Sequence, residues 1–372
     1  MGTVVDSHVH IFPYLGGASG FPSDAEHRQF LQLYMATHGE PVRRLRDHVQ
    51  VNQRTLHDGR LDSLSSLREV NFRAGRFGRF EWTCDNEDLY LQFFPPSLQS
   101  MESPPDFMLQ QMARAGVDRA VLQNARLYGR LNDYFAAAVQ TYPDRFIGLA
   151  DVDEVNAYTD AEITGLRRAV REQSLRGLYY ANRALIKTGY ARGLDDRAFD
   201  VFWESVRDLG IPVFWEIVGI PDPNSQADLL REIERLNRWA ERWPEIRGVW
   251  THGFAPELLE RMPPAVEELL RRDQFMVEIL YPIHWGRTHE YPFAELRPAL
   301  QTLHQHVGGE RLVWGSDMPN VERNCTYRQS LEYLRFATEG WLPSVDLDRI
   351  LGANVMQILS ERVQGAKPLE SP

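Results

Sequence analysis

The chain has 372 residues, 43% of them hydrophobic, and a formal net charge of −11, so it is long and apolar enough for a large folded core. Its acidic balance gives no electrostatic basis for binding nucleic acid or an anionic membrane surface, and no apolar run approaches the ~20 residues that a membrane span needs. The two cysteines, Cys84 and Cys325, lie too far apart along the chain to indicate a disulfide scaffold, so we expect a soluble, cytoplasmic protein.

The chain opens with a β-branched apolar stretch, TVVDSHVH, which predicts a strand over residues 3–10. Alternate residues of a strand share a face, so His8 and His10 are expected to point the same way. Residues 13–100 follow, with Gly- and Arg-rich pieces, mixed polar and aromatic runs and a Pro-rich end. This segment is too long for an ordinary connection, and its many aromatic residues argue against a disordered loop. We expect an inserted lid or cap with irregular strands and short helices.

From about residue 105, strand-like runs alternate with amphipathic helical segments such as DRAFDVFWESVRDLG, residues 196–210. The further strands are predicted at residues 118–125, 144–152, 175–181, 211–217, 246–252, 274–280 and 311–317. With the first strand these make eight, and eight strands separated by helices over this length predict an α/β protein with a (β/α)8 TIM barrel. Residues 1–372 then form one domain that carries the 13–100 insertion after its first strand.

Ionisable residues stand at the ends of several predicted strands. In a parallel barrel all strand ends open on one face, where catalytic residues gather. The residues at these ends are His8, His10, Glu216, His252 and Asp317. A single histidine on a strand is more often structural than functional, but the joint placement of five ionisable groups favours a shared polar site.

The ordered motifs DSHVH, IPVFWE, THGF and WGSDMP, with GVDRAVLQ, YPDRFIGLADVD and ILGANVMQIL, resemble those of the amidohydrolase superfamily. The resemblance is to its amidohydrolase 2 group, which includes enzymes like aminocarboxymuconate-semialdehyde decarboxylase and resorcylate decarboxylase. It implies a (β/α)8 barrel with one divalent metal ion, zinc or manganese, bound by His8, His10 and Asp317. It also implies that His252 is a catalytic acid or base, and that the protein forms homodimers.

The sequence departs from this group at the fifth strand. The group usually has a histidine four residues after the proline, whereas Pro212 is here followed four residues later by Glu216. A carboxylate can replace an imidazole as a ligand, and it would favour a harder ion, which makes manganese as plausible as zinc. The alternative is that Glu216 has lost the ligand role and the site binds metal weakly or not at all.

The resemblance favours a metal-dependent, non-oxidative decarboxylase of a hydroxylated aromatic or unsaturated carboxylic acid, with Asp317 and His252 as the proton-transferring groups. A hydrolase acting on a lactone or amide, or a hydratase, would use the same residues, and a non-catalytic barrel stays open. For the small anionic substrate, we expect Arg126 to bind a carboxylate and His284 to face the substrate. The alternatives are that Arg126 is a solvated arginine in a loop and that His284 has a structural or surface role.

Overall fold

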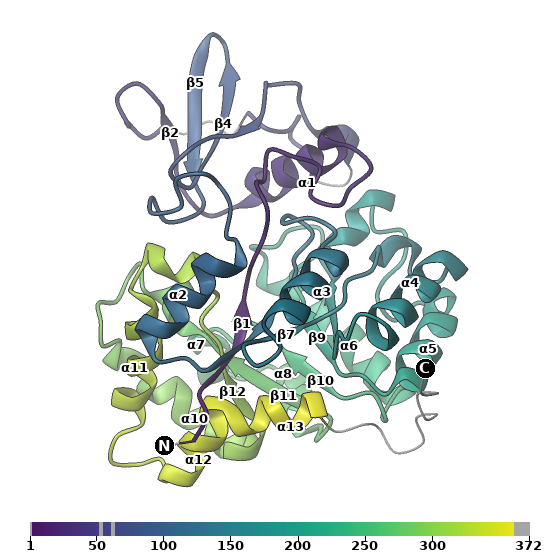
Figure 1. Ribbon diagram of the computed structural model, residues 1–372, viewed down its shortest axis with the longest axis vertical. Helices are drawn as coiled ribbons and strands as arrows, with labels where there is room; N and C mark the ends of the chain where they lie inside the picture. Colours follow the sequence, from purple (N-terminus) through teal and green to yellow (C-terminus); the bar gives the residue numbers. More distant parts are fainter. Residues whose placement is uncertain (1, 52–54, 61–63, 361–372) are drawn as a thin grey trace.

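The computed structural model describes residues 2–51, 55–60 and 64–360 of the chain (Figure 1). In this part of the chain, parallel strands form a three-stranded sheet in the order β1-β6-β7 and a five-stranded sheet in the order β12-β11-β10-β9-β8. Their bounds are β1 Val5–Val9, β6 Arg119–Leu122, β7 Phe146–Gly148, β8 Leu178–Ala181, β9 Val213–Glu216, β10 Gly248–Trp250, β11 Phe275–Ile279 and β12 Leu312–Trp314. All eight predicted strands are confirmed, each within its expected range.

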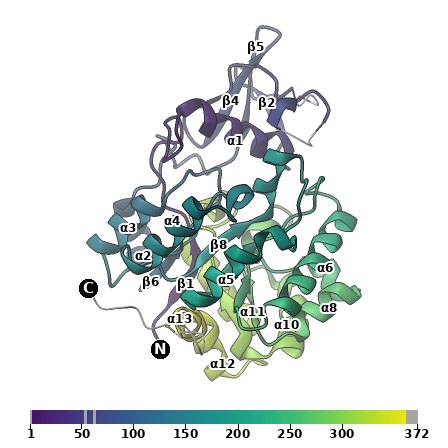
Figure 2. The ribbon, with the colours of Figure 1, turned by 90° about the vertical axis from the view of Figure 1, so that its right-hand side faces the viewer.

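Two isolated parallel bridges join the edges of these sheets. Val9 at the end of β1 bridges to Met318 just after β12, and Ala150 just after β7 bridges to Leu178 of β8. Helices pack on the outside of the strands (Figures 1 and 2). The protein is therefore a mixed α/β fold in which the strands run parallel and their carboxyl ends share one side.

The helices mostly follow the strands in alternation. They are α2 Pro105–Ala115, α3 Asn132–Thr141, α4 Asp160–Arg171, α5 Asp200–Leu209, α6 Gln226–Arg242, α7 Pro256–Glu260, α8 Pro264–Arg271, α9 Tyr281–Trp285, α10 Arg297–Val307, α11 Tyr327–Thr338, α12 Ser344–Asp348 and α13 Asn354–Ser360. Helix α5 shows why they form: Phe202, Trp203 and Val206 repeat at helical spacing and are buried, and Gly210 ends the helix with a φ of 66°.

Large aromatic side chains fill the space between strands and helices. The rings of Tyr180, Trp203, Trp215 and Trp239 lie with centroids 4.6 to 5.4 Å apart, and all four side chains are fully buried. Fully burying a large apolar side chain contributes roughly 1.5–3 kcal/mol, so this cluster anchors β8 and β9 to α5 and α6. Gly248 of β10 leaves room for the neighbouring ring of Phe275, because a Cβ at this position would lie only 2.7 Å from that ring.

Residues 13–100 project from the carboxyl ends of the parallel strands. This segment contains helix α1 Asp24–Thr37 and an antiparallel sheet in the order β2-β5-β4-β3, with bounds β2 Val42–Arg44, β3 Arg73–Ala74, β4 Arg79–Cys84 and β5 Glu87–Gln92. It forms the upper lobe in Figures 1 and 2. Parts of the expected insertion, residues 52–54 and 61–63, lie outside the described residues.

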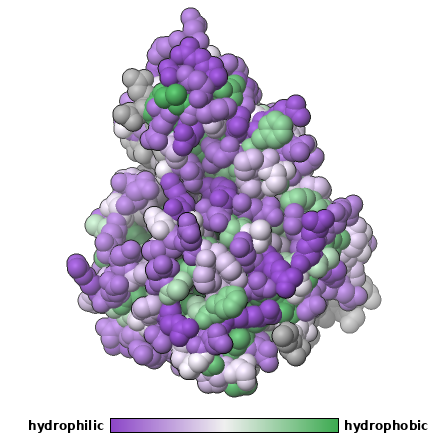
Figure 3. Space-filling view, turned by 90° about the vertical axis from the view of Figure 1, so that its left-hand side faces the viewer, coloured by the Kyte–Doolittle hydropathy of each residue, from purple (hydrophilic) through white to green (hydrophobic). Residues whose placement is uncertain are grey.

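Hydrophilic side chains cover most of the face shown in Figure 3, with small scattered hydrophobic patches, and the upper lobe is the narrower part of the molecule. Among the residues that the structure describes, none of the helices has both the length and the apolar character that a bilayer crossing requires.

Candidate metal centre and active site

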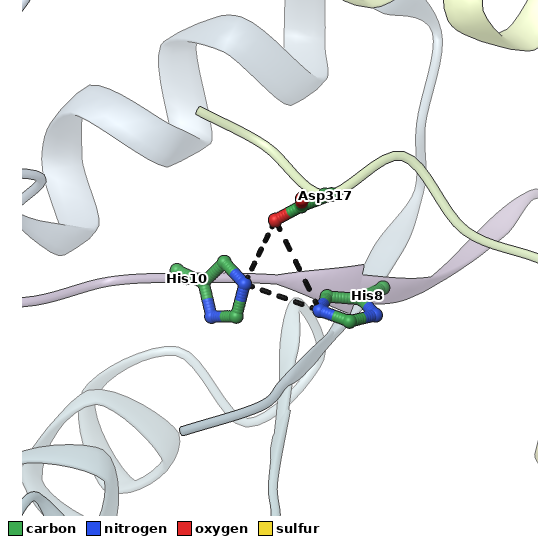
Figure 4. A group of neighbouring side chains, drawn as sticks. All are labelled: His8, His10 and Asp317. Carbon is green, nitrogen blue, oxygen red and sulfur yellow. Dashed lines mark hydrogen bonds and ion pairs between the residues drawn. The ribbon is translucent and has the colours of Figure 1, made fainter. Parts of the chain in front are cut away.

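His8, His10 and Asp317 come together where β1 meets the segment that follows β12. The backbone N–H of Asp317 donates to the carbonyl of His8 at 2.9 Å, and the N–H of His10 donates to the carbonyl of Met318 at 2.7 Å. These bonds align the two segments, so that His10 Nε2 lies 2.9 Å from Asp317 Oδ1 and His8 Nε2 lies 4.0 Å from the same oxygen (Figure 4). Each of the three residues offers one ligand atom, and these atoms all lie within 4.8 Å of one another.

The Nδ1 nitrogen of each imidazole is hydrogen-bonded to an oxygen. His8 Nδ1 lies 2.8 Å from Glu278 Oε2, and His10 Nδ1 lies 2.8 Å from the carbonyl of Gln123. Since these oxygens are acceptors, each Nδ1 donates its hydrogen to them, and each Nε2 is left to bind a proton or a cation. The two Nε2 atoms are only 3.1 Å apart, and a proton or a cation between them removes the repulsion of their lone pairs. Histidines that bind metals have this arrangement, so the donor set fits a divalent cation.

The surrounding charges favour a cation at this place. Burial alone would lower the pKa of His8, but the adjacent Glu278 carboxylate outweighs it and raises the pKa to about 9. Burial alone would raise the pKa of Asp317, but the hydrogen bond from His10 and the charges of His10 and His8 hold it well below its usual range. Asp317 is therefore an ionised carboxylate that faces imidazole nitrogens.

His252 lies beside this group. Its ring centroid is 5.0 Å from that of His8, and its backbone N–H donates to Glu278 Oε2 at 3.0 Å. Burial, followed by the charge of His8, lowers the pKa of His252 to about 4, so at neutral pH the imidazole is neutral and can accept a proton. Both His252 and Asp317 have left-handed backbones, with φ of 65° and 63°, a strained conformation that is concentrated at functional sites.

The group opens into a cavity of about 330 Å³, within the size range of sites for small molecules. Residues of the parallel strands and of the segments that follow them line it together with residues of the insertion. The first set includes His10, Tyr128, Tyr179, Arg183, Glu216, His252, His284, Arg287, Asp317, Asn320 and Arg323, and the insertion contributes Tyr34, His38, Gly39 and Phe93. The cavity thus combines candidate metal ligands, neutral histidine and arginines with aromatic walls.

The structure brings most of the predicted site residues to this cavity. His284 lines it, with its ring centroid 5.7 Å from that of His252. Glu216 also lines it, but the group of three ligand atoms does not include its carboxylate, which instead accepts a hydrogen bond from Tyr179 at 3.0 Å. A ligand role for Glu216 stays a prediction.

Arg126 is not brought to the cavity. Its buried guanidinium lies 2.5 Å from Glu154 and 3.5 Å from Asp151, and it also donates to the carbonyl of Val152. Its neighbours Ala125 and Leu127 line the cavity instead. The side chain points away because these two buried carboxylates require a cation. Arg126 is therefore neither a carboxylate-binding residue of the cavity nor a solvated arginine in a loop, but the buried partner of two ion pairs.

The model of the amidohydrolase family matches residues 5–359. The chain belongs to the amidohydrolase family. The match spans both sheets, the insertion and every residue of the candidate metal centre. Together with this convergent site, it identifies the chain as an enzyme, and it confirms the family that the strand-end motifs indicated.

Named proteins similar to this amidohydrolase include decarboxylases and a hydrolase. A curated relative, 2-amino-3-carboxymuconate-6-semialdehyde decarboxylase of Dictyostelium discoideum, is 30% identical over 132 residues, which cover 31% of this chain and 35% of the relative. The chain therefore matches only about a third of that relative's length.

Two solved structures share the fold at low sequence identity. One is 5-carboxyvanillate decarboxylase from Novosphingobium aromaticivorans, complexed with manganese and 4-hydroxy-3-methoxy-5-nitrobenzoic acid; its TM-score is 0.52 and its identity 17%, over 68% of this chain and 79% of that one. The other is a probable 2-pyrone-4,6-dicarboxylic acid hydrolase from Acinetobacter baumannii with citric acid bound; its TM-score is 0.53 and its identity 16%, over 70% and 90%. At these identities the likeness establishes the fold.

Sequence reasoning missed the residues that support the metal centre from beneath. Glu278 is fully buried in β11, where it also accepts a hydrogen bond from the Ser7 hydroxyl at 2.6 Å. Asp6 is fully buried in β1 and accepts bonds from the Ser316 backbone at 2.9 Å and the Tyr327 hydroxyl at 2.7 Å. Both carboxylates are visible in the sequence as single acidic residues within apolar strands, which is a signal for a buried polar network in this amidohydrolase.

Proposed function

We propose that this amidohydrolase is a metal-dependent, non-oxidative decarboxylase of a hydroxylated aromatic or unsaturated carboxylic acid. The observation that carries the proposal is the group formed by His8, His10 and Asp317, of which His10 and Asp317 line a cavity together with neutral His252. The curated relative, which is a decarboxylase, supports the same reaction class.

In this proposal His8, His10 and Asp317 hold one divalent cation, zinc or manganese, and Glu216 completes the ligand set. The cation would neutralise the substrate's carboxylate and an adjacent hydroxyl or keto oxygen. Glu278 and the carbonyl of Gln123 fix the tautomers of the two histidines through Nδ1, so that both Nε2 atoms are preorganised as ligands. Manganese in the similar Novosphingobium structure supports the choice of a hard divalent ion.

His252 and Asp317 move the proton that decarboxylation requires. On binding, the substrate's hydroxyl gives its proton to the neutral imidazole of His252 or to Asp317, and that group passes it to the ring carbon that bears the carboxylate. The bond from this carbon to the carboxylate then breaks, its electron pair restores the aromatic ring, and CO2 leaves. Burial, followed by the charge of His8, lowers the pKa of His252 to about 4, so the imidazole is unprotonated at neutral pH before the first transfer.

The aromatic walls and the insertion would provide the environment for this chemistry. We propose that the two bridged sheets form a closed (β/α)8 barrel, and that residues 13–100 act as a lid, since Tyr34, His38, Gly39 and Phe93 line the cavity. Excluding water strengthens the electrostatic interactions in such a site. Phe93 and Tyr128 both line the cavity, and their aromatic rings would pack against a flat substrate.

The test uses manganese- or zinc-loaded protein and a panel of hydroxybenzoic acids labelled with carbon-13 at the carboxyl group. Formation of labelled CO2 and an equal amount of the phenol is the expected result. His252→Asn should reduce the rate by about 10²–10⁴-fold while the bound metal is retained, because general acid–base catalysis typically contributes this factor. His289, which is about a third accessible and pairs with Glu295, provides the matched control as His289→Asn.

Two outcomes would contradict the proposal. Cleavage of a lactone or pyrone ester without release of CO2 would make the protein a hydrolase that uses the same residues. Stoichiometric metal binding without turnover of any acid in the panel, or of a lactone or pyrone ester, would favour a non-catalytic barrel.

A further inference from the structure

Two arginines lie together on the cavity wall formed by the loops after β11 and β12. Arg287 follows helix α9, which carries His284, and Arg323 lies six residues after Asp317. Both line the cavity. Nη1 of each arginine lies 3.5 Å from the same carboxylate oxygen, Oε1 of Glu40, which belongs to the insertion.

Glu40 holds the two guanidinium groups side by side without neutralising both. Two positive charges share one carboxylate, which leaves this trio with a net charge of +1. Glu40 is not among the residues that line the cavity, whereas both arginines are, so the carboxylate contacts them from outside the cavity. In the described part of the chain, no other ion pair of either arginine is present.

A hydrogen bond and an aromatic ring hold the guanidinium group of Arg323 in place. Its Nε donates to the carbonyl of Asn320 at 3.3 Å, and its guanidinium carbon lies 5.6 Å from the ring centroid of Phe93, which also lines the cavity. The side chain is only 16% exposed, so it is held in place by packing. The structure gives Nη2 of Arg323 no partner among the described residues, which leaves it available to a ligand.

Arg183, the other arginine named above on the cavity wall, is placed differently. Its guanidinium stacks over the ring of Tyr34 at 4.1 Å and donates to the carbonyl of Leu33 at 3.4 Å. Its charge acts on Glu216, where it opposes the effect of burial on the pKa of that carboxyl group. Arg183 therefore offsets the negative charge of Glu216, whereas Arg287 and Arg323 together carry one positive charge more than Glu40 neutralises.

We propose that Arg287 and Arg323, tethered by Glu40, form an anion subsite that binds a second carboxylate of the substrate. The inference rests on the proposed function for the first carboxylate, which lies at His8, His10 and Asp317. A single carboxylate at the arginine pair would neutralise the remaining positive charge and can accept hydrogen bonds from both guanidinium groups. The substrate class is then a flat, hydroxylated dicarboxylic acid, in which one carboxylate is lost and the other anchors the ring.

The test compares ligands that differ by one carboxylate. Salicylate has the hydroxyl and carboxylate expected at the metal; 4-hydroxyisophthalate and 2-hydroxyterephthalate each add a second carboxylate at a different position on the ring. Their Kd values are measured by calorimetry at pH 7 with manganese-loaded wild type, Arg287→Gln, Arg323→Gln and the double variant. Arg328→Gln is the matched control, since this exposed arginine on α11 pairs with Glu332 instead.

At least one dicarboxylate is expected to bind the wild type and Arg328→Gln about tenfold more tightly than salicylate, the gain typical of one charge-assisted contact. This gain should fall at least threefold in each single variant and disappear in the double variant, while the Kd of salicylate changes less than twofold. If the double variant does not fold, as judged by circular dichroism, the two single variants decide.

No gain in the wild type, or a gain that survives in the arginine variants, would overturn the subsite. These results are separate from the test of the decarboxylase. Loss of the gain without any CO2 release would retain the subsite and refute the reaction, whereas CO2 release with an unaffected gain would do the reverse.

Discussion

Replacing Glu278 by glutamine removes the negative charge that holds His8 in place, while the size of the side chain stays nearly the same. Oε2 of Glu278 accepts from His8 Nδ1 at 2.8 Å and from the His252 backbone at 3.0 Å, and Oε1 accepts from Ser7 at 2.6 Å and from Gln123 at 3.3 Å. The charge and hydrogen bond of His8 outweigh burial and lower the pKa of this carboxyl group, so it is ionised and only accepts. A glutamine has one oxygen, and its NH2 group must face donors on one side.

The expected loss can be estimated from this geometry. Removing the outer partner of a metal-bound histidine typically weakens metal binding 10–100-fold, which corresponds to about 1.4–2.7 kcal/mol. A donor left unsatisfied at a fully buried site also lowers the free energy of unfolding by about 1–3 kcal/mol. We therefore predict that Glu278→Gln folds, melts at a lower temperature and binds manganese 10–100-fold more weakly than the wild type.

The assay is competition between the protein and a chelator of known manganese affinity, with a thermal melt of each variant. Glu267→Gln on α8 is the matched control, because this carboxylate is half-exposed and pairs with Arg271 of the same helix. A manganese Kd for Glu278→Gln within twofold of the wild type would refute the reasoning, since it would mean that His8 does not need its carboxylate partner to bind the ion.

Three further predictions concern other parts of the molecule. Glu216→Ala should lower the metal affinity measured by the same chelator competition, and an unchanged Kd would remove Glu216 from the ligand set. Arg126→Leu should lower the free energy of unfolding by about 3–5 kcal/mol in urea titrations, because it leaves two buried carboxylates uncompensated. Burial raises the pKa of both Asp151 and Glu154, the latter to about 7, so this loss should be larger at pH 8, where they ionise, than at pH 5, where Glu154 is protonated. Chelator treatment of the wild type should lower its melting temperature, because free metal at 100 times its Kd stabilises the folded state by about 2.7 kcal/mol; equal melting temperatures would indicate that no such site exists.

The strands and the residues at their ends could be predicted because each depends on local pattern. Alternation in the first strand placed His8 and His10 on one face, and the shared direction of parallel strands placed His252 and Asp317 near them. These predictions needed no knowledge of side-chain conformation, since the backbone alone places a residue at the carboxyl end of such a strand on the shared face.

The remaining site depends on contacts between segments far apart in the sequence. The sequence places Arg126 just after a strand, where it could meet a substrate, whereas the fold brings Asp151 and Glu154 beside its guanidinium. Conversely, Arg287 and Arg323 lie in loops with no strand pattern, and their pairing becomes visible only when Glu40 of the insertion reaches both. Which partner an arginine meets is decided by tertiary structure.

The most direct test of the account is a titration of manganese into chelator-treated protein while CO2 release from a turned-over hydroxybenzoic acid is followed. The account predicts no release without metal, a linear rise to a plateau at one ion per chain, and no restoration in a His8→Ala/His10→Ala variant. Release of CO2 by the chelator-treated protein, or by that double variant at the rate of the wild type, would contradict it.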